Sequence, residues 1–349
     1  MNAVAASVGV AMRGRLVLGV AVGAGFLALL LGLLALTGRD PLTVAWTMAS
    51  YGFLDPNGRA ETVVRAIPLC LMGLGVAIAF RAGAFNIGAD GQLIAGSALA
   101  MAAVPFLVGL PGWIGGAAFL LVAAAGGGAW GGVAGWLRAR FGANEIIVTI
   151  MLNYVALQLL SWLIRGPMQE RMRMLPRSDA LPVPFRLPVV LDGTRIHAGV
   201  WIALAATVLL ALVLRRTVFG YRLDMVGRNP AAARVGGIGD RGVVVAAMLV
   251  GGALCGLAGA VEIAGLHFRL QEGIAVGYGI TAIAIALLAR TEPLAVPVAA
   301  VALAALYVGG AAVQRQFAVP FPTVKMVEGL IVFAFLAFVA LRRPGARGG

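Results

Sequence analysis

Residues 85–96, FNIGADGQLIAG, decide how the rest of the chain is interpreted. They combine Asn86, Asp90 and Gln92 with three glycines, and they lie between two apolar runs that are each long enough to cross a bilayer. Backbone polar groups left unsatisfied in lipid cost several kcal/mol each, so a polar, glycine-rich stretch at this place must line protein or water. We therefore interpret it as part of a translocation path or its gate, with these candidate residues: Phe85, Asn86, Gly88, Asp90 and Gln92.

The composition excludes an ordinary soluble protein. The chain has 349 residues, of which 61% are hydrophobic and 12% are charged, and its mean hydropathy is +0.97. Soluble domains carry roughly 25% charged residues. Glycine contributes 49 residues, and small residues allow membrane helices to approach one another closely. We therefore expect a polytopic membrane protein.

The net charge of +13 comes almost entirely from arginine, since Lys325 is the only lysine. Such a charge is compatible with binding to nucleic acid or to anionic lipid. The arginines cluster at the ends of the apolar runs, however, as the positive-inside rule predicts for cytoplasmic loops. We favour this second interpretation and expect no nucleic-acid partner.

Cysteine, histidine and acidic residues show no pattern of metal ligands. Cys70 and Cys255 both lie inside apolar runs, so they are predicted to be small buried side chains without a disulfide. Glu262, His267 and Glu272 follow one another at a spacing that fits no usual ligand set. No metal site is expected, and these three residues are predicted to serve docking or simply to face water.

About 20 residues of helix cross the ~30 Å hydrocarbon core. Counting on this basis predicts an all-α membrane protein with about ten transmembrane helices. The first span is expected to be retained, because it is too long for the core of a signal peptide. The third is either a full span or a broken one. The predicted spans are 16–36, 61–80, 87–109, 113–137, 145–164, 199–214, 243–262, 273–289, 294–312 and 325–341.

The positions of the arginines also predict how the chain is oriented in the membrane. Arg13 and Arg15 place the N-terminus in the cytoplasm, and an even number of spans returns the arginine-rich tail to the same side. The loop 165–198 falls outside although it holds six arginines. Because prolines and three acidic residues share this loop, it is predicted to be a folded external excursion.

The starts of the spans suggest an inverted repeat. Spans two to five and spans seven to ten begin at similar offsets, roughly 180 residues apart, and they enter the membrane from opposite sides, as in many transporters. Glycine-interrupted connections recur at matching places, 83–91 toward the cytoplasm and 265–279 toward the outside. Two gates on opposite faces would allow alternating access, and the second connection adds three path candidates: Gly277, Tyr278 and Gly279.

The predicted organisation is one polytopic transmembrane domain, residues 1–349. Its parts are a first span at 16–36, a first half at 61–164, an external loop at 165–198, a linking span at 199–214, a cytoplasmic coupling loop at 215–242 and a second half at 243–341.

Within the cytoplasmic loop, NPAAARVGGI (229–238) predicts a short helix. Asn229 can cap it, Pro230 suits its first turn, and Gly236 and Gly237 can end it. A short capped helix on the cytoplasmic face is either a docking element or a plain connection, and the residues alone leave both interpretations open.

Three sequence blocks together resemble one known family. The pattern G-R-N-P-x-A-A-R-x-x-G-I at 227–238 resembles the coupling segment of permease subunits in bacterial ABC importers of the branched-chain amino acid, ribose and nucleoside type. FNIGADGQ at 85–92 and GYGITAIAIALLARTEPLAVPVAA at 277–300 are similar to blocks of the nucleoside and simple-sugar branch. Two positions depart from that branch: Asp90 stands where Glu is commoner, and Ala289 stands where Gly usually precedes Arg290. The resemblance extends from about residue 60 to about residue 340.

The resemblance implies a transport subunit that is not itself an enzyme and lies in the bacterial inner membrane. Separate ATPase subunits would bind ATP and Mg, an external binding protein would deliver the solute, and a second related permease would complete the pore. The sequence has no G-x-x-x-x-G-K-[ST], so ATP must be hydrolysed elsewhere. The residues implied to couple with the ATPases are Gly227, Arg228, Asn229, Pro230, Ala231, Ala232, Arg234, Gly237 and Ile238.

Several polar residues keep two interpretations. Asn86 and Gln92 either contact the solute or cap a helix, whereas capping is favoured for Asp90. Asn153, beside Tyr154, either binds a polar ring edge or forms hydrogen bonds between helices. Two further pairs are predicted to be structural: Asn144 and Glu145 as a helix start, and Lys325 with Glu328 as an i,i+3 pair.

The function predicted from the sequence is inward transport of a nucleoside or a similar sugar-containing solute. An ABC permease for a simple sugar or an amino acid remains an alternative. An ion-driven secondary transporter would need a carboxylate deep in the bundle, and the candidate carboxylates are predicted to lie near the ends of spans. A membrane enzyme is disfavoured because no catalytic cluster is visible in the sequence.

Overall fold

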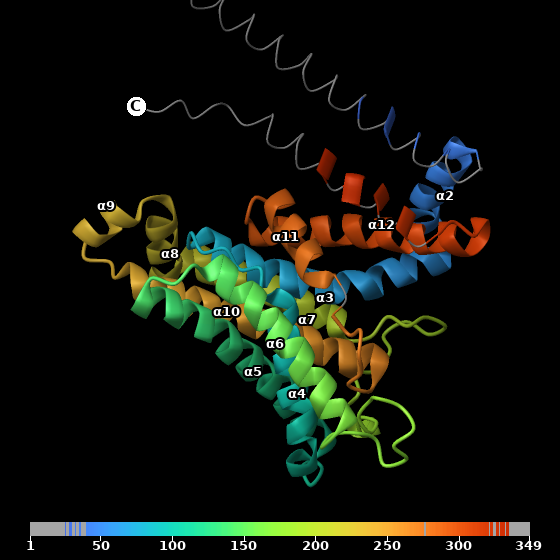
Figure 1. The fold of residues 1–349 in the computed structure, drawn as a ribbon, viewed down its shortest axis with the longest axis horizontal. Helices are drawn as coiled ribbons and strands as arrows, with labels where there is room; N and C mark the ends of the chain where they lie inside the picture. Colours follow the sequence, from blue (N-terminus) through green and yellow to red (C-terminus); the bar gives the residue numbers. More distant parts are fainter. Residues whose placement is uncertain are drawn as a thin grey trace, which may run out of the picture. The chain divides into compact units, whose positions relative to one another are not determined.

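The computed structural model describes residues 40–320 except Val276, together with scattered positions within 25–35 and 322–334. The predicted spans 16–36 and 325–341, and the Lys325–Glu328 pair, lie outside the continuously described residues. In the described part the chain is helical (Figure 1), and two isolated β-bridges, Arg177–Gln271 and Val189–His197, are its only extended pairings. The all-α prediction is confirmed for these residues.

The described helices follow in chain order. They are α2 (Pro41–Phe53), α3 (Pro56–Arg81), α4 (Ala89–Leu107), α5 (Gly112–Phe141), α6 (Glu145–Arg165), α7 (Gly199–Arg216), α8 (Val218–Arg228), α9 (Pro230–Val235), α10 (Asp240–Glu262), which continues as a π-helical turn (Ile263–His267), α11 (Tyr278–Leu288) and α12 (Val296–Phe317). Short 3₁₀ turns occupy Val183–Phe185 and Pro293–Ala295.

Among the described residues, seven helices are long and apolar enough to cross a membrane. They are α3, α4, α5, α6, α7, α10 with its π-helical turn, and α12 with the 3₁₀ turn before it. They account for the predicted spans at 61–80, 87–109, 113–137, 145–164, 199–214, 243–262 and 294–312.

The prediction of a full span at 273–289 is wrong. Helix α11 begins only at Tyr278 and has 11 residues, or about 16 Å at 1.5 Å per residue. The hydrocarbon core is ~30 Å thick. Gly273 and Gly277 precede the helix with φ of 81° and 76°, a left-handed conformation that interrupts helical structure. Helix α11 is therefore a half-length helix that follows an irregular connection.

Helix α2 was not predicted from the sequence. Asp40 caps this helix by accepting a hydrogen bond from the Thr43 amide at 2.9 Å, and Pro41 occupies its first turn. With 13 residues it is too short to be recognised as a span. In a compact unit made of residues 1–62 and 304–349, it packs through Val44 and Met48 against Val313.

A second compact unit, residues 63–303, holds the candidate site. Helix α10 packs against α5 and α4, and α4 also packs against α6 (Figure 1). The contact between α10 and α5 depends on glycine, because a Cβ added to Gly256 would lie 2.9 Å from Cα of Gly127 and would overlap the carbonyl oxygen of Ala123. The two backbones touch, as in other small-residue contacts between membrane helices.

The close contact between α5 and α10 predicts the effect of one methyl group. Gly256→Ala should destabilise the protein by about 1–3 kcal/mol, because the added Cβ meets backbone that cannot rotate away. The measurement is the thermal unfolding midpoint of the purified protein in detergent. Gly242→Ala in the same helix is the matched control, since no atom lies within 4 Å of the added Cβ. Equal midpoints for the two variants would contradict this account of the interface.

Candidate functional site

The polar residues at the start of α4 hold one another in place. Asn86 is fully buried and Gln92 is 1% exposed. Their side-chain amides form two reciprocal hydrogen bonds, both of 3.0 Å, and Asn86 Oδ1 also accepts one from the Gly88 amide at 3.0 Å. These groups are satisfied within the segment, so the geometry assigns Asn86 and Gln92 to shaping the turn before α4.

Asn153 fastens this turn to α6. Its Oδ1 accepts from the Gly91 amide at 2.8 Å, and its Nδ2 donates to the Ile87 carbonyl at 2.9 Å. Tyr154 beside it is 62% exposed. Of the two interpretations of Asn153, the geometry matches hydrogen bonding between segments.

Asp90 caps a helix, but not its own. The residue before α4 is Gly88, which has no side chain to cap the helix. Asp90 Oδ1 instead accepts a 2.7 Å hydrogen bond from the amide of Gly279, in the first turn of α11. The first amides of a helix have no partner inside it, and here a side chain from α4 supplies one for α11.

This hydrogen bond corrects the predicted geometry of the two gates. The sequence places the connections 83–91 and 265–279 on opposite faces, yet their helix-start ends meet at Asp90 and Gly279. The other ends of the two connections contact different parts of the chain. The Gly83 carbonyl accepts from Arg138 at 3.1 Å, whereas Leu270 pairs with Ser178 of the loop 165–198. The two connections therefore approach one meeting point from different ends of the bundle.

A buried polar cluster surrounds the start of α11. The Glu262 side chain is 3% exposed and lies 3.2 Å from Nε2 of His267. The Tyr278 hydroxyl lies 3.5 Å from the same carboxylate, and the Arg65 guanidinium sits over the Tyr278 ring, 5.9 Å from its centroid. Gly277, which begins this helix with φ of 76°, provides the turn that brings Tyr278 into the cluster.

Tyr278 was predicted from the sequence, whereas Arg65 and the burial of Glu262 were not. The expectation that Glu262 faces water is wrong, because its side chain is 3% exposed. It lies five residues before the end of the π-helical turn at His267, near the end of its span as predicted. A usable signal was present, since an ionisable residue inside an apolar run is by default a candidate functional residue.

Phe85 lies apart from this cluster. Its ring is 53% exposed and packs 5.3 Å from that of Phe80. Its amide donates to Glu145 Oε1 at 3.3 Å, and the same carboxylate pairs with Arg138 at 2.6 Å. Asn144 caps α6 at this end, as predicted, by accepting from the Ile146 amide at 2.9 Å.

The short helix predicted within 229–238 is present as α9. Asn229 Oδ1 accepts from the amides of Ala231 and Ala232 at 3.1 and 3.0 Å, and Gly237 follows the helix with φ of 76°. A second helix, α8, comes directly before it and ends at Arg228, and Asn229 between them is extended, with φ of −155°. The segment is a pair of helices joined by one capping residue.

Helix α8 is joined to two distant segments by ion pairs. Asp224 binds the Arg81 guanidinium with both oxygens, and Arg81 also reaches Glu292 Oε1 at 3.3 Å. Arg215 approaches the other oxygen of Glu292, also at 3.3 Å. Arg81 ends α3 and Glu292 follows α11, so this network joins α8 to the segment before the connection 83–91 and to the segment after α11.

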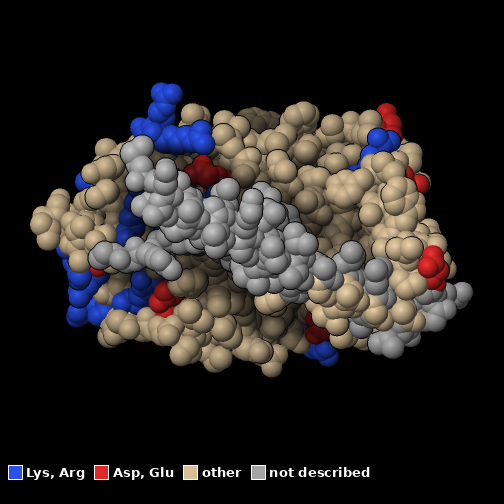
Figure 2. Space-filling model, turned by 90° about the horizontal axis from the view of Figure 1, so that it is seen from above, with Lys and Arg blue, Asp and Glu red and all other residues tan. Residues whose placement is uncertain are grey.

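A groove of about 600 Å³ lies beside α9. Arginines gather at the end of the molecule that carries α8 and α9 (Figure 2). The groove is lined by Gly227 and Pro230 of the coupling segment and by three arginines: Arg138, Arg140 and Arg241.

Seven apolar helices, two broken connections that meet inside the bundle, and a capped helix pair beyond it define a multi-pass membrane transport protein. Residues 58–338 match the family described as the branched-chain amino acid transport system permease component, and the chain belongs to this family.

Known relatives are ABC transporter permeases. The chain is 38% identical over 314 residues to the glucose ABC transporter permease protein TsgB13 of Haloferax volcanii, covering 87% of this chain and 82% of the relative. It is 36% identical over 286 residues to the guanosine ABC transporter permease protein NupP of Bacillus subtilis, covering 81% and 82%. The nucleoside ABC transporter permease protein NupB of Lactococcus lactis is 29% identical over 309 residues, covering 83% and 82%. The chain is thus an ABC importer permease subunit, and the predicted resemblance is confirmed.

The hydrogen bond between Asp90 and Gly279 predicts a difference between two substitutions. Asp90→Asn keeps a side-chain oxygen that can accept from the Gly279 amide, whereas Asp90→Ala leaves that amide without a partner, a loss of about 0.5–2 kcal/mol by analogy with helix caps. We expect solute uptake by the assembled transporter to fall severalfold more in the alanine variant, at equal amounts of permease in the membrane. Equal loss in both variants would show that the negative charge matters and not the accepting oxygen.

Proposed function

We propose that this chain imports a nucleoside or a similar sugar-containing solute by alternating access about the meeting point of α4 and α11. The observation that carries the proposal is the hydrogen bond from the Gly279 amide to Asp90. It joins the half-length helix α11 to the start of α4, which follows an irregular connection. Transporters commonly place the solute site where such broken helices meet. The printed names of the relatives, which include guanosine, nucleoside and glucose permeases, support this solute class.

We propose that an inverted repeat underlies the alternating movement. Helices α3 and α10, the first helices of the two proposed halves, cross closely: a Cβ added to Gly251 of α10 would meet the Gly75 carbonyl at 2.5 Å, and one added to Gly75 of α3 would meet the Gly251 carbonyl in turn. Along the chain, α3 is followed by the connection 83–91 and α4, and α10 is followed by the connection 265–279 and α11. We retain the proposal that the halves 61–164 and 243–341 are inverted, with about ten spans and both termini in the cytoplasm.

The chemistry of the cluster around α11 suits a polar solute. Glu262 can accept hydrogen bonds from sugar hydroxyls, Arg65 and Tyr278 can donate, and the Tyr278 ring offers an apolar face. We propose that these three residues, with Gly277 and Gly279, line the path. Because their amides are already satisfied, Asn86, Gln92 and Asn153 act by holding the gate in shape.

The proposed partners follow from the family. ATPase subunits in the cytoplasm bind ATP and Mg, an extracytoplasmic binding protein delivers the solute, and a second related permease completes the pore in the bacterial inner membrane. Contact with the ATPases falls on α9 and its flanks, Gly227–Ile238. Movement of α8 reaches Arg81 and Glu292 through the ion pairs of Asp224.

Uptake measurements test the proposal in cells that carry the whole transporter. We expect radiolabelled guanosine or adenosine to accumulate in an ATP-dependent manner, and the charge reversal Arg228→Glu with Arg234→Glu to abolish uptake while the chain stays in the membrane. Uptake of glucose but not of nucleosides would make the proposed solute wrong and keep the permease. Uptake that ignores ATP and both substitutions would contradict the proposed coupling.

The Asp224 ion pair predicts uncoupling. Asp224→Asn should preserve ATP hydrolysis by the reconstituted complex but lower the number of solute molecules moved per ATP. The reason is that the substitution removes the ion pair by which α8 is attached to Arg81. The exchanged pair Arg81→Asp with Asp224→Arg should recover part of the loss. If the Asp224→Asn variant transports as efficiently as the unmodified complex, the Asp224–Arg81 ion pair does not couple α8 to transport.

A further inference from the structure

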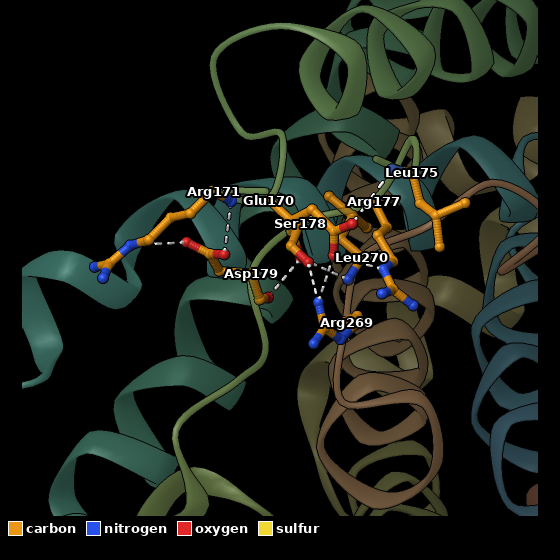
Figure 3. A network of polar contacts seen from close by, with 8 residues as sticks. All are labelled: Glu170, Arg171, Leu175, Arg177, Ser178, Asp179, Arg269 and Leu270. Carbon is orange, nitrogen blue, oxygen red and sulfur yellow. Dashed lines mark hydrogen bonds and ion pairs between the residues drawn. The ribbon is translucent and has the colours of Figure 1, made fainter. Parts of the chain in front are cut away.

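The external loop 165–198 is fastened to the segment before α11 by one buried carboxylate. The Glu170 side chain is 7% exposed, and its Oε2 accepts hydrogen bonds from Arg177 at 2.7 Å and from Arg269 at 3.0 Å. Its Oε1 accepts from the Leu175 amide at 3.2 Å. Figure 3 shows Glu170 between the two guanidinium groups, one from the loop and one from the segment after α10. A buried charge is stable only with such partners.

Backbone hydrogen bonds extend the contact around Glu170. The Ser178 amide donates to the Leu270 carbonyl at 2.8 Å, and the Leu270 amide donates back to the Ser178 hydroxyl at 2.9 Å (Figure 3). Arg269 donates to the Ser178 carbonyl at 3.2 Å. Further along, the Leu181 amide donates to the Phe268 carbonyl at 2.8 Å. The loop and the segment 268–271 are therefore paired over several residues.

Other charges of the loop are held more loosely. Arg171 pairs with Asp179 at 3.6 Å, and these side chains are 94% and 58% exposed. Arg165 and Glu272 are 59% and 47% exposed, and the hydrogen bond from Arg165, followed by that from Ser161, holds the pKa of Glu272 below its usual value. Exposed pairs hold segments weakly, so among these ion pairs the buried ones of Glu170 hold the loop most firmly.

The fastened segment leads directly to the gate. Phe268 has φ of 55° and Gly277 has φ of 76°, so the chain turns sharply at both ends of 268–277. One residue after Gly277 begins α11, whose first turn is bonded to Asp90 and contacts Glu262.

We propose that Glu170 is a positioning residue that makes the external loop and the segment 268–271 one rigid body, so that docking of the solute-binding protein on the loop moves α11. The inference rests on the proposed import function, because it names how delivery on the outer face reaches the gate. The loop presents an exposed and largely apolar surface to the binding protein, with these residues: Arg171, Met172 and Met174.

The test compares two substitutions that each remove one negative charge from the same loop. In the complete transporter reconstituted in liposomes, Glu170→Gln should lower the stimulation of ATP hydrolysis by guanosine-loaded binding protein about fivefold or more. Basal hydrolysis without binding protein should be unchanged. The matched control is Asp179→Asn, which removes an exposed charge and should keep full stimulation. Full stimulation in Glu170→Gln, or equal losses in both variants, would overturn the proposal.

A disulfide separates positioning from a general loss of structure. Arg177 and Gln271 form an antiparallel bridge, and Cα atoms opposite each other in such a pair lie about 4.5–5.5 Å apart, within disulfide range. Arg177→Cys with Gln271→Cys, added to Glu170→Gln, should restore stimulation when oxidised and lose it again on reduction. Oxidation without recovery contradicts the proposal, and so does a pair that cannot be oxidised.

The two proposals fail in different ways. If the solute class is wrong, guanosine neither stimulates nor enters through the unmodified transporter, and the same comparison is then made with glucose. If Glu170 has no positioning role, the unmodified transporter responds and the Glu170→Gln variant responds equally.

Discussion

Every backbone group freed by breaking a helix inside the bundle must find a partner in the protein, because lipid offers none. The site is built around this constraint. The segment before α4 is irregular, and the side chains of Asn86 and Asn153 take up its amides and one of its carbonyls. Helix α11 starts inside the bundle, and Asp90 accepts from its first turn. The polar residues predicted from the sequence to line the path therefore serve mainly as hydrogen-bond partners for the backbone where helices are interrupted.

Close helix contacts make that polar interior possible. Where α5 and α10 touch through Gly127 and Gly256, backbone atoms meet without side chains between them. The same holds where α3 and α10 meet at Gly75 and Gly251. Such contacts leave little room for sliding, because any shift brings backbone against backbone. The irregular connections, where the left-handed residues lie, are not held by such backbone contacts in the same way.

Features that depend on residues close together along the chain could be predicted from the sequence. Helix α9 was found because Asn229, Pro230 and Gly237 are neighbours along the chain, and the long apolar helices were found because length and composition suffice. Features that depend on distant residues were missed. The partner of Asp90 lies 189 positions away, so its capping role could not be assigned to α11. The length of α11 and the burial of Glu262 depend likewise on how the π-helical turn and the connection after it pack.

Ion pairs define which parts can move as one body. Arg81 joins α3 to Asp224 of α8 and to Glu292. Glu170 joins the loop 165–198 to Arg269. A single exposed pair would add little rigidity, but each of these charges has two charged partners and is at least partly buried. Left-handed residues flank both groups, Arg290 and Thr291 before Glu292 and Phe268 before Arg269. A β-branched residue such as Thr291 adopts this conformation only when its surroundings impose it. Each ion-pair network therefore holds the chain next to a sharp turn, one before α11 and one after it.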